Sequence, residues 1–200
     1  MSVDKVILKT FLTTLLAITI LIASMFLALI CAFPQTMMEL TYNMGMESSS
    51  IYFAEDAYRR TDDVGYIAYA TEVAILDDNN AKIVKCGEKL IKDKGFAAYC
   101  QKKDEQVQTE TSYEQYVYGQ VCVAMYKEGK KEEAIERAFA LIGNNFPPYN
   151  AVVALLVAAN NAQDVQSIEM IKGKMNELQE NGLDDASTAV LEDILARLEK

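Results

Sequence analysis

The first helical stretch of the chain is apolar on every face. Between Val6 and Phe33 the only charged residue is Lys9, and residues 10–33 carry no charge at all. At about 1.5 Å per residue, a helix of this length reaches across a hydrocarbon core of about 30 Å. The pattern therefore predicts a transmembrane helix that places residues 10–33 in a lipid bilayer.

Cleavage as a secretory signal or a lipoprotein is the alternative for this segment. The apolar region of a secretory signal normally covers only about 7–15 residues and ends in a small-x-small site. The best such site ends at Ala32 and has the bulky Ile30 at its −3 position. Ile30 also precedes Cys31, where lipoprotein processing favours a small residue. The sequence therefore favours a retained membrane anchor.

In the rest of the chain, apolar residues recur with a helical period between polar turns. Residues 35–50 are predicted to form a helical continuation or short connector, in which Ser48–Ser50 cap the next helix. Residues 101–112 are predicted to be a polar separator between two helical groups. No segment alternates with period two for long enough to predict a strand, so the expected fold is all-α. The further helices are predicted over residues 51–60, 64–76, 81–94, 118–142 (two helices and a turn), 150–160, 164–180 and 184–200.

Residues 118–142, YGQVCVAMYKEGKKEEAIERAFALI, carry a partial motif. This hairpin resembles a tetratricopeptide repeat (TPR), a 34-residue unit with the pattern W-x2-L-G-x2-Y, a turn glycine, A-x3-F and a proline. Gly129 falls on the turn glycine and Ala134 on the small residue of the second helix. The other motif positions, in order, are occupied by Tyr118, Val121, Cys122, Met125, Ala138 and, one residue late, Pro147.

The match is best over residues 115–148 and weaker over 149–182, where the helix phase recurs without the motif residues. Before residue 115 a similar segment aligns only at a spacing of about 51 residues, against the repeat length of about 34. The resemblance implies a TPR-like α-solenoid of stacked antiparallel helix pairs, and an irregular helical bundle is the alternative.

The chain is thus expected to have three parts and a terminal cap. Residues 1–33 form the N-terminus and membrane helix, residues 34–63 a connector and the first helix, and residues 64–200 the TPR-like domain. A C-terminal amphipathic helix is predicted to cap the open end of the stack. Its single apolar stripe consists of Val190, Leu191, Ile194, Leu195 and Leu198.

Composition argues against several classes of function. With 29 acidic and 19 basic residues the net charge is −10, which repels phosphate backbones and predicts no nucleic-acid partner. The chain has no histidine, the commonest general base and transition-metal ligand. The segment that starts at Asp77 does not match the calcium-binding loop of an EF-hand, because Ala81 and Lys82 stand where an oxygen ligand and a glycine are needed. We predict no enzyme activity, cofactor or metal.

Three cysteines follow the apolar segment, namely Cys86, Cys100 and Cys122. Each lies among apolar residues, where a buried thiol behaves as a small hydrophobic side chain. Free, packed cysteines are therefore expected. A Cys86–Cys100 disulfide is the alternative, and it would indicate an oxidising compartment.

Binding remains as the expected function. The TPR resemblance implies a ligand along the concave face made by the first helix of each hairpin, and the leading hypothesis is a scaffold or recruitment module for a protein partner. One alternative is an accessory subunit that contacts a membrane complex through its transmembrane helix, and another is an extracytoplasmic domain that binds a peptide or small ligand. The candidate residues on the first-helix face are Tyr116, Tyr126, Lys127, Asn150, Asn160 and Asn161.

Flanking charges predict the orientation of the apolar segment. Lys5 and Lys9 precede its uncharged part, and no lysine or arginine follows until Arg59. Under the positive-inside rule, the N-terminus stays in the cytoplasm and residues 34–200 lie on the extracytoplasmic side of a single-pass protein, in a bacterial cell membrane.

A cysteine placed on either side of the span tests this orientation. In intact cells, a membrane-impermeant thiol reagent should label Ser48→Cys, whereas Ser2→Cys should react only after lysis. Labelling of Ser2→Cys alone in intact cells would reverse the predicted topology.

Overall fold

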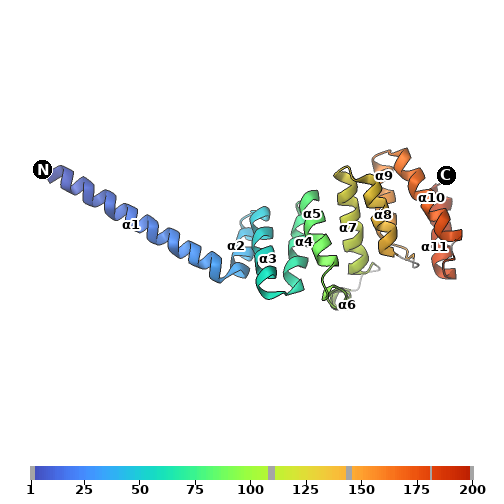
Figure 1. The fold of residues 1–200 in the computed structure, drawn as a ribbon, viewed down its shortest axis with the longest axis horizontal. Helices are drawn as coiled ribbons and strands as arrows, with labels where there is room; N and C mark the ends of the chain where they lie inside the picture. Colours follow the sequence, from blue (N-terminus) through green and yellow to red (C-terminus); the bar gives the residue numbers. More distant parts are fainter. Residues whose placement is uncertain (1–2, 108–110, 143–145, 181, 199–200) are drawn as a thin grey trace.

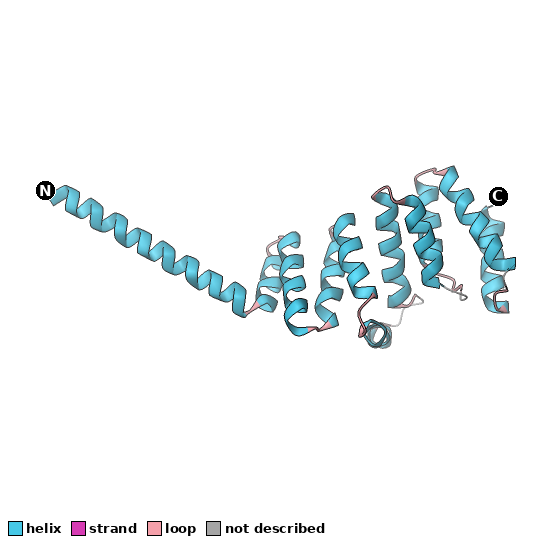
Figure 2. Ribbon diagram, in the orientation of Figure 1, coloured by secondary structure: helices cyan, strands magenta, loops and turns pink. Residues whose placement is uncertain are grey.

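Most of the helices that follow the apolar segment form one row. The computed structural model describes residues 3–107, 111–142, 146–180 and 182–198, and in this part of the chain all regular structure is helical (Figures 1 and 2). The all-α prediction is therefore confirmed for the described residues. In chain order the helices are α1 (Val3–Ala32), α2 (Pro34–Asn43), α3 (Glu47–Thr61), α4 (Val64–Leu76), α5 (Asn80–Ile91), α6 (Phe96–Gln106), α7 (Tyr113–Lys127), α8 (Lys131–Ile142), α9 (Ala151–Asn161), α10 (Val165–Glu180) and α11 (Asp185–Leu198).

Helix α1 is long and apolar enough to cross a membrane. Its most apolar part, Leu8–Leu29, has 22 residues and rises about 33 Å, close to the thickness of a hydrocarbon core. None of this part is buried against the rest of the chain, and α1 projects from one end of the row (Figure 1). Its apolar side chains thus have no core to join.

Four helix pairs share one turn geometry. In each, the residue that ends the turn donates its amide to a carbonyl five residues earlier, as in the Schellman motif. These bonds span 2.9–3.1 Å and join Met46 to Thr41, Asn79 to Ala74, Lys130 to Met125 and Asp164 to Ala159. The preceding residue is left-handed in every case, at Gly45, Asp78, Gly129 and Gln163. The pairs α2/α3, α4/α5, α7/α8 and α9/α10 are therefore equivalent hairpins.

The spacing of these turns explains the irregular period in the sequence. The left-handed residues of these four turns, 45, 78, 129 and 163, are 33, 51 and 34 positions apart. The long interval contains α6 and the loop after it, the 17 positions from Phe96 to Ser112. Without this insertion, the long interval would equal the one between Gly129 and Gln163. It is thus one hairpin repeat plus an inserted helix.

Helix α6 corrects the prediction of a polar separator. The structure makes residues 101–106 helical, and α6 lies across the ends of its neighbours, outside the row (Figure 1). Two residues of α6, Phe96 and Cys100, are buried, while its polar residues face solvent or bind neighbouring elements. Asp104, for example, accepts a 2.7 Å hydrogen bond from the amide of Tyr113. Because α6 lies aside, α5 packs directly on α7.

The predicted serine cap is also wrong. Helix α3 begins at Glu47, before the serines, and its N-cap Met46 makes no side-chain cap bond. The hydroxyl of Ser50 instead donates to the carbonyl of Met38 at 2.9 Å and is fully buried. It therefore links α3 to α2, and residues 35–50 belong to a complete hairpin instead of a connector.

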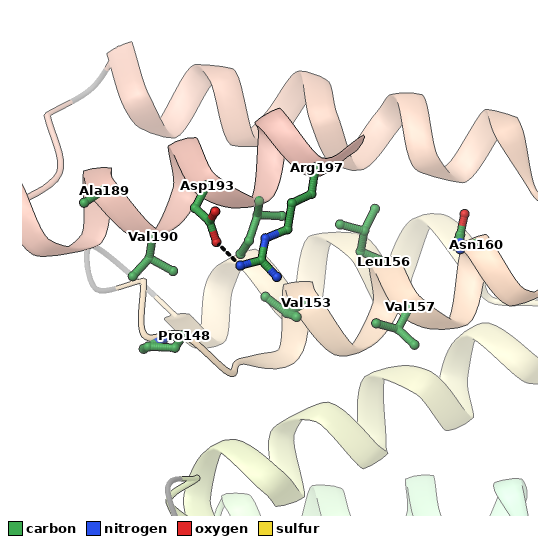
Figure 3. A pocket seen from close by; sticks show the side chains of 10 residues that line it. Pro148, Val153, Leu156, Val157, Asn160, Ala189, Val190, Asp193 and Arg197 are labelled. Carbon is green, nitrogen blue, oxygen red and sulfur yellow. Dashed lines mark ion pairs between the residues drawn. The ribbon is translucent and has the colours of Figure 1, made fainter. Parts of the chain in front are cut away.

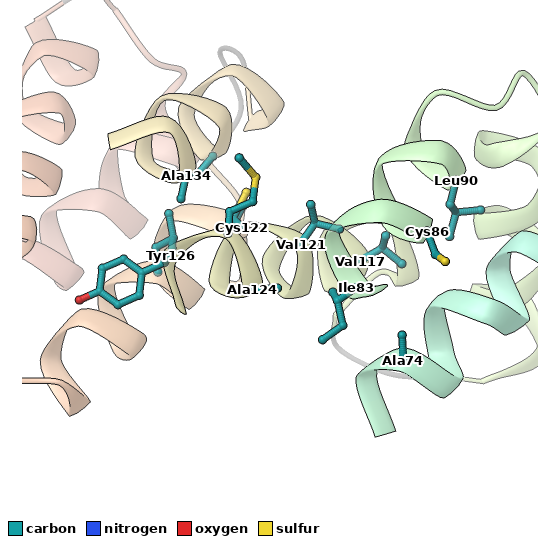
Figure 4. Close-up of a cluster of buried hydrophobic side chains, with 14 of the residues drawn as sticks. Ala74, Ile83, Cys86, Leu90, Val117, Val121, Cys122, Ala124, Tyr126 and Ala134 are labelled. Atoms are coloured by element: carbon teal, nitrogen blue, oxygen red, sulfur yellow. The ribbon is translucent and has the colours of Figure 1, made fainter. Parts of the chain in front are cut away.

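The three cysteines are free and buried, so the expected packing is confirmed and the Cys86–Cys100 disulfide is not formed. Burial raises the pKa of Cys86 to about 11 and the pKa of Cys100 and Cys122 to about 12. At neutral pH all three are therefore uncharged thiols. Figure 4 shows Cys86 on α5 and Cys122 on α7, in the apolar cluster that joins these helices.

The contact between α5 and α7 depends on Gly87. A Cβ atom at this position would overlap Cγ2 of Val121, which is fully buried and, as a β-branched residue, has little rotamer freedom. We expect Gly87→Ala to lower the free energy of unfolding by about 1–3 kcal/mol, measured by thermal unfolding of the full chain in detergent and followed by circular dichroism.

Gly173→Ala is the matched control for this prediction. Gly173 lies in α10, has an ordinary helical φ, and an added Cβ would meet no atom within 4 Å. Since alanine favours the helix, this change should stabilise the chain by about 0.5–1 kcal/mol. If Gly87→Ala behaved like Gly173→Ala, the close approach of α5 and α7 would be contradicted.

Candidate functional site

The six residues predicted as partner-binding form three pairs, each with the spacing of one hairpin repeat. Tyr126 and Asn160 occupy matching positions three residues before the left-handed turn residues, and Lys127 and Asn161 follow them. Tyr116 lies within α7, whereas its counterpart Asn150 precedes α9. The structure therefore repeats the backbone position of two pairs, relative to the turn, and not that of the third.

Asn150 has a structural role in the folded chain. It is fully buried and caps α9, where its Oδ1 atom accepts hydrogen bonds from the amides of Val152 and Val153 at 2.9 and 3.0 Å. Its Nδ2 group donates to the carbonyl of Pro147 at 2.8 Å. Both the oxygen and the nitrogen of this side chain thus bind inside the protein.

Tyr126 also connects elements of the row. It is only 7% exposed, and its hydroxyl donates to Oδ2 of Asp164 at 2.7 Å. Asp164 precedes α10 and also accepts hydrogen bonds from Nζ of Lys131 at 2.7 Å and from the hydroxyl of Ser167 at 2.8 Å. This cluster ties the end of α7 and the start of α8 to the turn of the next hairpin.

The remaining candidates differ in exposure. Tyr116 is half-buried and packs on the ring of Tyr113. Lys127 is exposed, and its Nζ atom lies 2.9 Å from Oδ1 of Asp78, the left-handed residue of an earlier hairpin turn. Asn160 and Asn161 are both exposed at the end of α9. Of the six, only Asn160 borders the groove between α9 and α11.

A groove of about 870 Å³ separates α9 from α11 (Figure 3). Its walls are mainly aliphatic, and at its edge an ion pair of 2.7 Å joins Asp193 to Arg197. Val157 stands 55% exposed in this groove. The apolar lining residues are Pro148, Val153, Leu156 and Val157 on one side and Ala189, Val190 and Ile194 on the other.

The groove exists because α11 packs mainly on α10. Leu191 is fully buried, and the N-terminus of α11 is held by the hydroxyl of Ser187, which accepts a 3.0 Å hydrogen bond from the amide of Phe146. Asp184 caps the same helix through the amide of Ser187 at 2.8 Å. These contacts attach α11 to α10 and to the loop before α9, and leave the face of α9 that carries Val157 open.

The apolar stripe predicted for the last helix is therefore divided in two. Leu191 is fully buried and Leu195 partly so, whereas Val190 and Ile194 line the groove. The side chain of Leu198 lies outside the described residues. Sequence reasoning missed the α9 wall, although AVVALLVAA in this helix has more apolar positions than one buried face requires.

The groove is suited to contact with apolar groups. Its two charged side chains, Asp193 and Arg197, are paired with each other, and Asn160 adds one amide. Within the described residues, no three His, Cys, Asp or Glu side chains are grouped to hold a metal ion. Comparison with protein-family models, curated proteins and solved structures gives no match for this chain.

The Asp164 cluster predicts a stability difference that depends on pH. Hydrogen bonds from Lys131, Tyr126 and Ser167 hold the pKa of Asp164 well below its usual 3.8. A carboxylate with a depressed pKa stabilises the fold above its unfolded-state pKa, and this contribution disappears as the pH falls toward the folded-state value. Asp164→Asn should therefore lower the Tm near neutral pH, and the difference should shrink below about pH 4. A difference in Tm that stays constant across this range would contradict the assignment.

Proposed function

We propose that the chain is a membrane-anchored docking protein that recruits a protein partner through the groove between α9 and α11. The observation that carries this proposal is the placement of two uncovered apolar surfaces. The membrane-length helix α1 projects from one end of the row, and α9 and α11, which line the groove, lie toward the other end (Figure 1). Such a molecule holds a partner at a distance from the bilayer.

In this proposal α1 is a single-pass anchor, with its N-terminus in the cytoplasm and the row on the other side. Four side-chain hydroxyls along α1 support contact with lipid, because each of them donates to a carbonyl of α1 itself and needs no neighbouring helix. These bonds of 2.8–3.0 Å are made by Thr13, Thr14, Thr19 and Ser24. They favour an anchor over an accessory subunit that binds through this helix.

The hairpins form a TPR-like scaffold in this proposal. Support comes from the nearly constant spacing of the left-handed turn residues, which is longer only where α6 is inserted. The turn glycine and small residue of the TPR pattern, Gly129 and Ala134, lie in a hairpin turn and in the buried face of α8, respectively. Stacked hairpins bury one continuous core, which keeps the groove at a defined distance from α1.

The partner segment best suited to the groove is an amphipathic helix. Helices of this kind place an apolar face, with anchors at i, i+3, i+4 and i+7, into a hydrophobic groove between two others. The groove volume of about 870 Å³ is large enough for several such side chains. Of the 29 acidic and 19 basic residues, 28 and 17 lie in 34–200, so basic residues at the edge of the partner helix would favour association.

Val157 and Val165 provide a matched test of the docking site. Both valines are exposed, by 55% and 67%, but Val165 lies at the start of α10 outside the groove. A photoreactive amino acid at position 157 of the full chain should form a specific crosslink to a protein in native membranes, and one at position 165 should not. An equal crosslink from both positions, or none from position 157, would contradict docking in the groove.

The same positions test the binding energy. Val157→Glu should weaken saturable binding of the crosslinked protein by about tenfold or more, because a buried, unpaired carboxylate is unfavourable. Val165→Glu should leave the affinity unchanged. Replacement of α1 by an unrelated apolar helix should also preserve binding, and its loss would favour the accessory-subunit alternative.

A further inference from the structure

Exposed apolar side chains are concentrated at the end of the row next to α1. Of the ten large hydrophobic side chains that are exposed in the described chain after α1, six lie between residues 33 and 52. The other four are spread over the remaining row. The six are Phe33, Leu40, Tyr42, Met44, Met46 and Tyr52, and the four are Leu76, Val107, Val157 and Val165.

Helix α2 has two apolar faces. One is buried in the first hairpin and contains Met37 and Met38. The other consists of Leu40 and the two cap residues that flank the helix, Phe33 and Met44, whose spacing of i, i+7 and i+11 places them on one side of it. These three residues, named here the α2 stripe, are 45–65% exposed. The outer hairpin of a helical stack normally presents polar residues to water. Exposure of the apolar α2 stripe to water is therefore unfavourable, and another apolar surface is expected to cover it.

The α2 stripe begins where the membrane-length helix ends. The amide of Phe33 still donates to the carbonyl of Leu29 at 2.9 Å, which places Phe33 about 6 Å beyond the last residue of Leu8–Leu29. That distance corresponds to the headgroup layer, because a bilayer is about 40–45 Å thick around a core of about 30 Å. Helix α2 then runs across the direction of α1 instead of continuing it (Figure 1). It is therefore placed to lie along a membrane surface.

We propose that α2 lies in the interface of the bilayer that α1 crosses, with the α2 stripe at the boundary between headgroups and acyl chains. This inference rests on the proposed membrane anchor. Apolar contact would provide the attraction, since no lysine or arginine occurs between residues 10 and 58, while Glu39 and Glu47 are acidic. The lipid is accordingly zwitterionic, not anionic. With α2 held on the surface, the row has a fixed tilt and presents its distal groove away from the membrane.

The absence of tryptophan from the chain allows a direct test with a single fluorophore. Three variants of the full chain are reconstituted in phosphatidylcholine vesicles, with or without brominated acyl chains that quench tryptophan on contact. Met44→Trp reports on the α2 stripe, Leu21→Trp on α1, and Val165→Trp on an exposed site far along the row. We expect about twofold lower emission with brominated lipid for Met44→Trp, stronger quenching for Leu21→Trp and no change for Val165→Trp.

The three probes separate failure of this inference from failure of the anchor. If Leu21→Trp is quenched and Met44→Trp is not, α1 enters the bilayer but α2 does not lie on it. Emission of Met44→Trp that is shifted to the blue but unquenched would mean that protein, such as a second copy of the chain, covers the stripe, which also overturns the inference. If Leu21→Trp is unquenched, the membrane anchor itself is wrong. Leu40→Trp repeats the test within α2, in case Met44→Trp disturbs the turn.

Discussion

The row of helices depends on one repeated backbone turn. At each hairpin a left-handed residue reverses the chain, and the amide that follows closes the last helical turn five residues back. Of the left-handed residues in the four hairpin turns only two are glycines, while Asp78 and Gln163 adopt φ values of 47° and 53°. A side chain makes this conformation less favourable by about 1–2 kcal/mol, so the turn persists there because packing of both helices requires it.

Because each hairpin has its own turn, a helix can be inserted between two hairpins without a change in how they stack. The α5–α7 contact forms as though α6 were absent, because the insertion leaves the row at the end of α5 and returns at Ser112. What makes this contact possible is the missing side chain of Gly87 beside Val121. The inserted helix is held by its own small apolar face and by bonds such as that of Asp104 to the next helix.

A row has two ends, and each leaves an apolar surface that no further hairpin covers. Near α1 this surface is the α2 stripe, and at the C-terminal end it is the groove beside Val157. In the proposed function, lipid covers the first and a partner helix the second. In this proposal the row uses its unpaired ends for attachment. Its interior contains the buried cysteines and tyrosine–carboxylate contacts between hairpins, such as that of Tyr126 with Asp164.

The sequence by itself determined the helical fold class, the membrane-length first helix and most helix bounds, including those of α4, because periodicity and turn residues are local signals. It also contained the turn at Gly129. Only the tertiary structure decided that residues 101–106 are helical, that Ser50 joins two helices, and that Asn150 and Tyr126 are used internally. The groove belongs to this second group. Its walls come from separate helices, and they face each other only because α11 packs on α10 and leaves one face of α9 open.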